Sequence, residues 1–235
     1  MMQLKTKKEE YAHFNKLSDE WWDDSGKFSV LHQIRPIRIN YIIRQLNKKQ
    51  FSKIDILDIG CGGGLTSESM AKLGANVTGV DFVKSNIDAA KFHSKNKDFK
   101  IKYICKDIEK NEIKDKYDLI IMFEILEHLD NWKSVLSSIK KNLKKGGKII
   151  ISTINRNIVS KYTAIFLAEN ILNWIPQGTH DYNKFIKPVE LKLFSKEINL
   201  EFKSLKGLVY NPIQREWKIT NSSLINYFCT LTKAN

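Results

Sequence analysis

Residues 56–64, which read ILDIGCGGG, decide the fold of this chain. A short apolar run carries one acidic residue, Asp58, and then opens into a burst of glycines in which Gly60, Gly62 and Gly64 alternate. This pattern predicts a buried strand that feeds a tight turn into a helix. Because glycine has no β-carbon, the turn lets the backbone approach a ligand closely.

A second apolar run, residues 77–80, follows and ends at Asp81. An acid at that place accepts hydrogen bonds from ribose hydroxyls, so the unit is expected to bind a nucleoside. The glycine spacing is not the G-x-G-x-x-G of dinucleotide sites, and Asp58 would repel a pyrophosphate. A carboxylate there suits the amino group of a methionine moiety, which favours S-adenosylmethionine (SAM). The alternative is a glycine turn in an arbitrary α/β protein.

Strands and helices alternate from residue 54 onward. Alternation of this kind predicts an α/β fold with a mostly parallel sheet and helices on both faces, whose ligands bind at the carboxyl ends of the strands. That edge would bring together Gly60, Asp81, Asp107, Phe123 and Glu124. The expected strands are near residues 54–59, 76–81, 100–105, 117–123 and 147–153, and the expected helices near 64–74, 84–96 and 131–144.

The remaining segments complete one predicted domain, residues 1–235, which is a usual length for a single core. Residues 1–50 are expected to form a helical cap, in which Pro36 suits the first turn of a helix. Farther along the chain, Gly146-Gly147 are expected to end a helix. Residues 157–181 are expected to form an apolar helical insertion. A helix near 188–198 and strands near 200–210 and 214–220 follow.

Composition narrows the function classes. The net charge is +13, yet only five of the 39 basic residues are arginine, the preferred side chain for phosphate and base contacts, so nucleic-acid binding is not expected. No run of 18 uncharged apolar residues occurs, so no transmembrane helix is expected, and the lysine-rich start is not expected to act as a secretory signal. The three cysteines, Cys61, Cys105 and Cys229, are expected to be reduced thiols in a cytoplasmic protein.

The chain also carries the motifs WWD at residues 21–23, RPIR at 35–38, DIGCGGG at 58–64, EILEH at 124–128, STINR at 152–156 and GTHD at 178–181. Together these motifs resemble the bacterial ubiquinone-biosynthesis O-methyltransferases, over about residues 10–232. Only the glycine motif is shared by all class I SAM-dependent methyltransferases. The resemblance implies a seven-stranded Rossmann-like sheet, SAM as the methyl donor, and methylation of phenolic hydroxyls on polyprenylated rings at two steps, 2-polyprenyl-6-hydroxyphenol and 3-demethylubiquinol.

The resemblance also assigns site residues. Arg38 matches the family's SAM-contacting arginine, Gly60 its glycine-loop contact and Asp81 its ribose acid. Phe123 stands where the family commonly has a methionine beside the adenosine. Asp107, after the third strand, is placed to accept from the adenine amino group; the alternative is a surface aspartate that caps a loop.

Methyl transfer to a phenol needs close alignment and a phenolate nucleophile. A divalent cation such as Mg²⁺ would lower the phenol's pKa, and the eukaryotic relatives hold a metal through residues that match Glu124, Glu127 and His128. Their spacing puts them on one helical face if a helix begins at the strand end. The alternative is a histidine general base, either His128 or His180, with His32 in reserve.

The insertion suggests where the protein works, because a polyprenylated substrate lives in the bilayer. An apolar segment with flanking cations fits a helix that lies on an anionic membrane surface, although a core or dimer helix is the alternative. We therefore expect a protein peripherally bound at the inner face of the cell membrane, with other ubiquinone-biosynthesis enzymes as candidate partners.

Three other functional classes are alternatives to a small-molecule methyltransferase. A nucleic-acid methyltransferase is disfavoured because the chain lacks a base-clamping Asn/Asp-Pro-Pro-Tyr tetrad, and a nicotinamide-dependent oxidoreductase is disfavoured by the glycine spacing. A non-catalytic SAM-binding subunit of a biosynthetic complex stays open.

Overall fold

The computed structural model describes residues 7–47, 51–160, 182–211 and 213–233. Its centre is an eight-stranded sheet in the order β3-β2-β1-β4-β5-β8-β6-β7. Strands β1 to β5 run parallel, while β8 is antiparallel to both β5 and β6. The strands are β1 Asp55–Ile59, β2 Asn76–Asp81, β3 Ile101–Cys105, β4 Tyr117–Phe123, β5 Leu143–Ile154, β6 Leu200–Asn211, β7 Glu216–Thr220 and β8 Asn226–Lys233.

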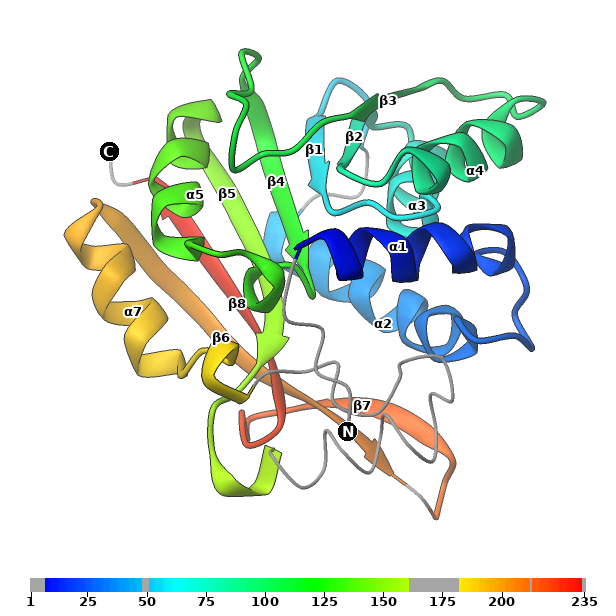
Figure 1. Cartoon of the computed structure of the whole chain (residues 1–235). Coiled ribbons are helices and arrows are strands. Elements are labelled where there is room, and N and C mark those ends of the chain that lie inside the picture. The colour runs from blue at the N-terminus through cyan, green and yellow to red at the C-terminus, as the bar shows by residue number, and fades with distance from the viewer. Residues whose placement is uncertain (1–6, 48–50, 161–181, 212, 234–235) are drawn as a thin grey trace.

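Helices cover both faces of the sheet (Figure 1). One face packs against α2 and α3, and the other against α5 and α7, while α1 lies across the carboxyl ends of the central strands. The helices are α1 Lys7–Leu17, α2 Ser29–Leu46, α3 Leu65–Lys72, α4 Lys84–Ser94, α5 Trp132–Ile139 and α7 Pro188–Glu197, with short 3₁₀ turns η1 Ser18–Glu20, η2 Leu126–His128, η3 Lys140–Asn142 and η4 Tyr182–Lys184.

Two hydrophobic clusters fill the layers. On one side Ile34 and Tyr41 of α2 and Met70 of α3 pack on the sheet, and on the other Leu136 of α5 and Leu191 of α7 do the same. Residues along β4 alternate between these clusters and are buried on both faces, which is typical of a central parallel strand. The Rossmann-like α/β class is therefore confirmed.

The predicted strand count of seven is wrong, because β8 was not predicted. This strand pairs with β5 on one side and β6 on the other, so residues 227–232 are all buried. Its sequence, YFCTLT, mixes aromatic residues with threonines and shows no strict apolar–polar alternation. A strand buried on both faces gives no period-two signal, which is why it escaped detection.

Two turn predictions also need correction. Pro36 lies inside α2 and not in a first turn, because the helix already begins at Ser29. Gly146 and Gly147 do not end a helix: α5 ends at Ile139, and the two glycines lie inside β5. The β4–β5 register shifts near these glycines, and Gly146 has a φ of 71°, as in a bulge.

None of the described helices is long and apolar enough to cross a bilayer. Most of the predicted insertion, residues 161–181, lies outside the described part of the chain. Its first residues are described, and Ile158 and Val159 there are 71% and 42% exposed.

Candidate functional site

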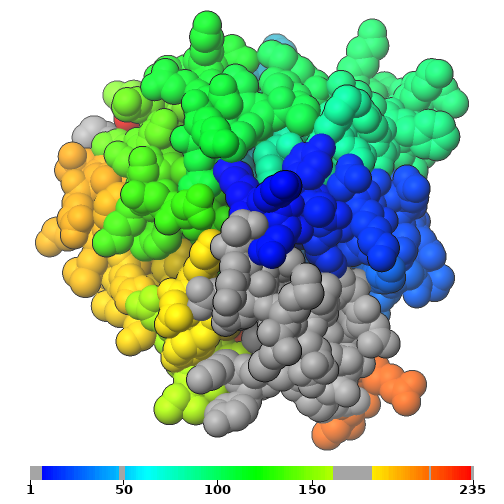
Figure 2. All heavy atoms as spheres, in the orientation of Figure 1, coloured from blue at the N-terminus to red at the C-terminus, as the bar shows by residue number. Residues whose placement is uncertain are grey.

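A cavity of about 210 Å³ opens at the carboxyl ends of β1, β2 and β4. Its walls come from the glycine turn, from the residues that follow β4, and from α1 and α2. Figure 2 shows α1, in blue, lying across this face of the molecule. The predicted residues Arg38, Asp58, Gly60, Gly62, Asp81, Phe123, Glu124, Glu127 and His128 all line the cavity.

The glycine turn is shaped by packing as well as by any ligand. Gly60, Gly62 and Gly64 have φ values of 69°, 52° and 88°, a region that favours glycine. A β-carbon at Gly62 would lie 2.3 Å from the indole of Trp21, and one at Gly64 would lie 2.3 Å from the Tyr103 hydroxyl. The glycines therefore let the cap residue Trp21 rest directly on the turn.

Asp81 holds this turn through its carboxylate. One oxygen accepts from the N–H of Gly62 at 2.9 Å, and the other accepts from the N–H of Val83 at 2.9 Å and from the Asn86 amide at 3.3 Å. Asn86 in turn accepts from the indole N–H of Trp21 at 2.8 Å. Three of the carboxylate's roughly four acceptor positions are thus in use, so the predicted ribose contact has about one position left.

Asp58 is a second buried acid at the turn. Its carboxylate accepts from the Ser67 hydroxyl at 2.6 Å, so the acid joins the glycine turn to α3. Burial raises the pKa of Asp58 to about 6, while the Ser67 hydrogen bond and the Arg38 charge act in the opposite direction. The group is still largely ionised at neutral pH, as its predicted contact with the SAM amino group requires.

Asp107 does not line the main cavity. It lines a smaller neighbouring one of about 30 Å³, which shares Gly60 and Asp81 with the first. Lys7 of α1 donates to Asp107 at 2.7 Å and to Glu109 at 2.8 Å. The adenine contact stays a prediction, and an adenine amino group would share Asp107 with the Lys7 ammonium.

Arg38 reaches the cavity from α2. Its guanidinium lies 3.2 Å from the Glu124 carboxylate and 5.0 Å from the centre of the Phe123 ring. The Ser152 hydroxyl donates to the same Glu124 oxygen at 2.6 Å. Among the described residues, the buried Nε of Arg38 has no hydrogen-bond partner, so one donor stays available in the cavity wall.

The prediction that Glu124, Glu127 and His128 share a helical face is wrong. Glu124 stands outside the helix with a φ of 50°, and only the single 3₁₀ turn η2 contains the other two. Glu127 accepts from Thr153 at 2.8 Å, and the His128 imidazole pairs with Glu10 of α1.

These three side chains therefore have separate partners. Within the described ranges, no three His, Cys, Asp or Glu residues are grouped to hold a metal ion. The arrangement does not fit a preformed Mg²⁺ site, and no chemical step below depends on one. The metal assignment stays a prediction from the resemblance.

The candidate bases differ in position. His180 lies outside the described residues, and the Nε2 of His32 is 3.0 Å from the carbonyl oxygen of Trp21. Burial acts to lower the pKa of His128, but the contact with Glu10 and the charges of Glu127 and Glu124 outweigh it and raise that pKa to about 9. A cation cannot accept a proton, so the predicted role of His128 as a base requires the Glu10 contact to open.

Several residues of the site were not found by sequence reasoning. Lys7 and Glu10 of α1 pair with Asp107 and His128, which lie more than 90 positions away in the chain. A local sequence pattern cannot predict contacts of this kind. Trp217 of β7 also lines the cavity. Asn86 was detectable, because it lies five residues after Asp81 in the first turn of the next helix.

The Glu10–His128 pair should make stability depend on pH. Its contribution is complete below the unfolded pKa of about 6.5 and is lost as pH rises through about 9. Between pH 6.5 and 9.5 we expect wild type to lose about 2 kcal/mol more than His128→Asn in urea unfolding. Equal losses in the two proteins would contradict the pair. Glu10→Gln should lie between wild type and His128→Asn, because it removes the partner charge but leaves the charges of Glu127 and Glu124 beside the imidazole.

Comparison with solved structures supports the fold. A magnesium protoporphyrin IX methyltransferase from Synechocystis PCC 6803 aligns with a TM-score of 0.70 at 15% identity, over 97% of this chain and 100% of that one. An N-methyltransferase from Bradyrhizobium japonicum WM9 aligns with a TM-score of 0.63 at 15% identity, over 96% and 98%. At these identities the likeness concerns the fold alone.

Sequence comparison is more specific. A methyltransferase-domain family model matches residues 31–204. A ubiquinone biosynthesis O-methyltransferase from Pelagibacter ubique is 44% identical over 234 residues, covering 96% of this chain and 98% of that protein. One from Rickettsia akari is 42% identical over 231 residues, covering 97% and 92%. The chain therefore belongs to the ubiquinone biosynthesis O-methyltransferase family.

Proposed function

We propose that this protein transfers the methyl group of SAM to phenolic hydroxyls of polyprenylated ubiquinone precursors. The substrates would be 2-polyprenyl-6-hydroxyphenol and 3-demethylubiquinol, so that one chain serves both O-methylation steps. The observation that carries the proposal is the 40–44% sequence identity, over nearly the full chain, to relatives named ubiquinone biosynthesis O-methyltransferase. The cavity at the strand ends agrees with it, since class I methyltransferases bind their donor there.

Different residues of the cavity would bind the cofactor, align the reactants and remove the phenolic proton. SAM, when bound, supplies an activated methyl group on a sulfonium. Gly60, Gly62 and Asp81 would hold its nucleoside part, and Asp58 and Arg38 its charged methionine end. The walls of the cavity would hold donor and acceptor aligned for an in-line displacement. The phenolic proton must leave before or during transfer, a task assigned by prediction to His128 or His180.

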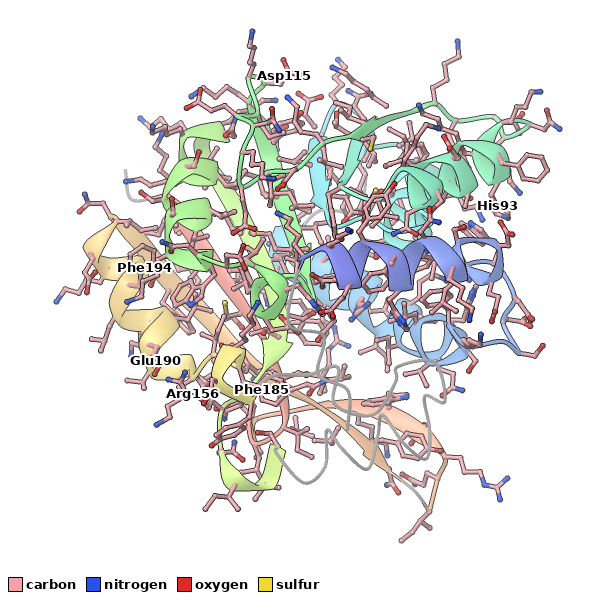
Figure 3. All side chains as sticks on the ribbon, in the orientation of Figure 1. His93, Asp115, Arg156, Phe185, Glu190 and Phe194 are labelled. Atoms are coloured by element: carbon pink, nitrogen blue, oxygen red, sulfur yellow. The ribbon has the colours of Figure 1, made fainter. Side chains whose placement is uncertain are left out.

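Methyl transfer tests the proposal directly. With SAM and short-chain analogues of the two phenols, we expect singly methylated products by mass spectrometry. Asp81→Asn should lower the rate at least tenfold, because an amide cannot accept the same hydrogen bonds. Asp115→Asn is the control, since that exposed carboxylate lies on the loop before β4, away from α1 (Figure 3). SAM binding without either methylated product would contradict the proposal and favour a non-catalytic SAM-binding subunit.

Chelation tests the predicted magnesium requirement. Because the three candidate ligands have separate partners in this structure, we expect turnover to persist in EDTA. Turnover that stops in EDTA and returns with added Mg²⁺, together with loss of that response in Glu124→Gln, would instead establish the metal role.

We also propose peripheral attachment to the anionic inner face of the cell membrane, beside other enzymes of the pathway. The exposed pair Ile158 and Val159, at the start of the insertion, and the net charge of +13 support this. Arg156, which precedes them, pairs with Glu190 of α7 and ties the start of the insertion to the domain (Figure 3).

Vesicle sedimentation checks the attachment. The protein should pellet with vesicles that contain phosphatidylglycerol and much less with pure phosphatidylcholine. Replacing Ile158 and Val159 with aspartate should reduce pelleting several-fold. Phe92→Asp, a change at an 84% exposed aromatic side chain of α4, should not. Equal pelleting of all three proteins would count against this surface.

A further inference from the structure

The cavity extends beyond the residues assigned to the cofactor. Its far wall is built by strands at the antiparallel end of the sheet, through Leu208 of β6, Trp217 of β7 and Asn226 of β8. Strand β7 is the outermost strand at this edge, and α2 packs against it. These three residues come from strands other than β1 and β2, which carry the glycine turn and Asp81.

Trp217 carries an unusual feature in this wall. Its indole Nε1 is buried and has no hydrogen-bond partner among the described residues. Buried N–H groups without a partner are rare in folded proteins, since each has lost its bond to water without replacement. Because Trp217 lines the cavity, a molecule bound there is the natural partner for this donor.

The position of Trp217 is fixed by its surroundings. It is paired with Tyr210 across the β6–β7 ladder, with ring centroids 5.4 Å apart, and it packs against the core cluster that contains Ile34 and Leu208. An indole N–H only donates, so it selects a hydrogen-bond acceptor. A donor held in this way discriminates by position as well as by chemistry.

Among the described residues, Nε of Arg38, which donates, and Oε1 of Glu127 are also buried polar atoms without a hydrogen-bond partner, and both residues line the same cavity. The apolar side chains of Val30 and Ile34 line the same cavity. The wall at Trp217 therefore suits an apolar body that carries an oxygen acceptor. A phenol ring with a second oxygen substituent has this character.

We infer that the Trp217 indole N–H donates a hydrogen bond to a ring oxygen of the phenolic substrate, other than the hydroxyl that receives the methyl group. Trp217 thus orients the ring and places the correct hydroxyl toward the donor. This inference rests on the proposed function, since it assumes a phenolic ring in the cavity.

Binding measurements test this independently of turnover. For the complex with S-adenosylhomocysteine, titration calorimetry with 2-prenyl-6-hydroxyphenol should give a Kd about five- to tenfold higher for Trp217→Phe than for wild type, as expected for one neutral hydrogen bond. The affinity for S-adenosylhomocysteine itself should not change. Trp132→Phe is the matched control, because that indole of α5 packs edge-on against Phe194 of α7 and is not among the residues that line the cavity.

A prenylphenol with a single hydroxyl separates the hydrogen bond from packing. It lacks the second ring oxygen, so its Kd should change less than twofold between wild type and Trp217→Phe. Incorporation of β-(3-benzothienyl)alanine at position 217, which keeps the indole shape without the N–H, should reproduce the phenylalanine result. An unchanged Kd for the dihydroxy ligand, or equal losses for both ligands, would overturn the inference. Failure of wild type to methylate a phenol that it binds would instead refute the proposed function and leave the binding comparison valid.

Discussion

The hydrogen bond from the Gly62 N–H to the Asp81 carboxylate is the contact on which the site depends. It joins the ends of two neighbouring parallel strands and sets the curvature of the glycine turn. The same carboxylate holds the N–H of Val83 before α4, and through Asn86 it reaches the indole of Trp21. One buried acid therefore positions the turn, the start of a helix and the cap above them. Loss of its charge would loosen all three together.

Ion pairs hold helix α1, which is part of the cap, over the opposite side of the cavity. Lys7 and Glu10 of α1 pair with Asp107 and His128, which belong to segments that follow β3 and β4. The first helix of the chain is thus attached to the same edge of the sheet that binds ligands in this fold class. Ligand entry and the position of α1 are consequently linked, because two of the predicted site residues already have α1 side chains as partners.

The sequence predicted which edge of the sheet carries the crevice, but not the side-chain contacts that hold the crevice together. The glycines and Asp81 follow apolar runs with clear strand character, so their place at the sheet edge was predictable from local pattern alone. The left-handed backbone of Glu124 depends on contacts with Arg38 and Ser152, which are distant in the chain. Strand β8 was missed because burial on both faces removes its alternation. Trp217 lies on β7, and no local motif links that strand to the cavity.

A crystal structure of the complex with S-adenosylhomocysteine tests the central claim most directly. The account predicts the ribose beside Asp81, the Gly62–Asp81 hydrogen bond intact, and Trp21 still resting on the glycine turn. The far wall at Trp217 should stay free for the second substrate. A ligand bound elsewhere, or a turn that rebuilds itself with Trp21 displaced from Gly62, would contradict a site that is assembled before the cofactor arrives.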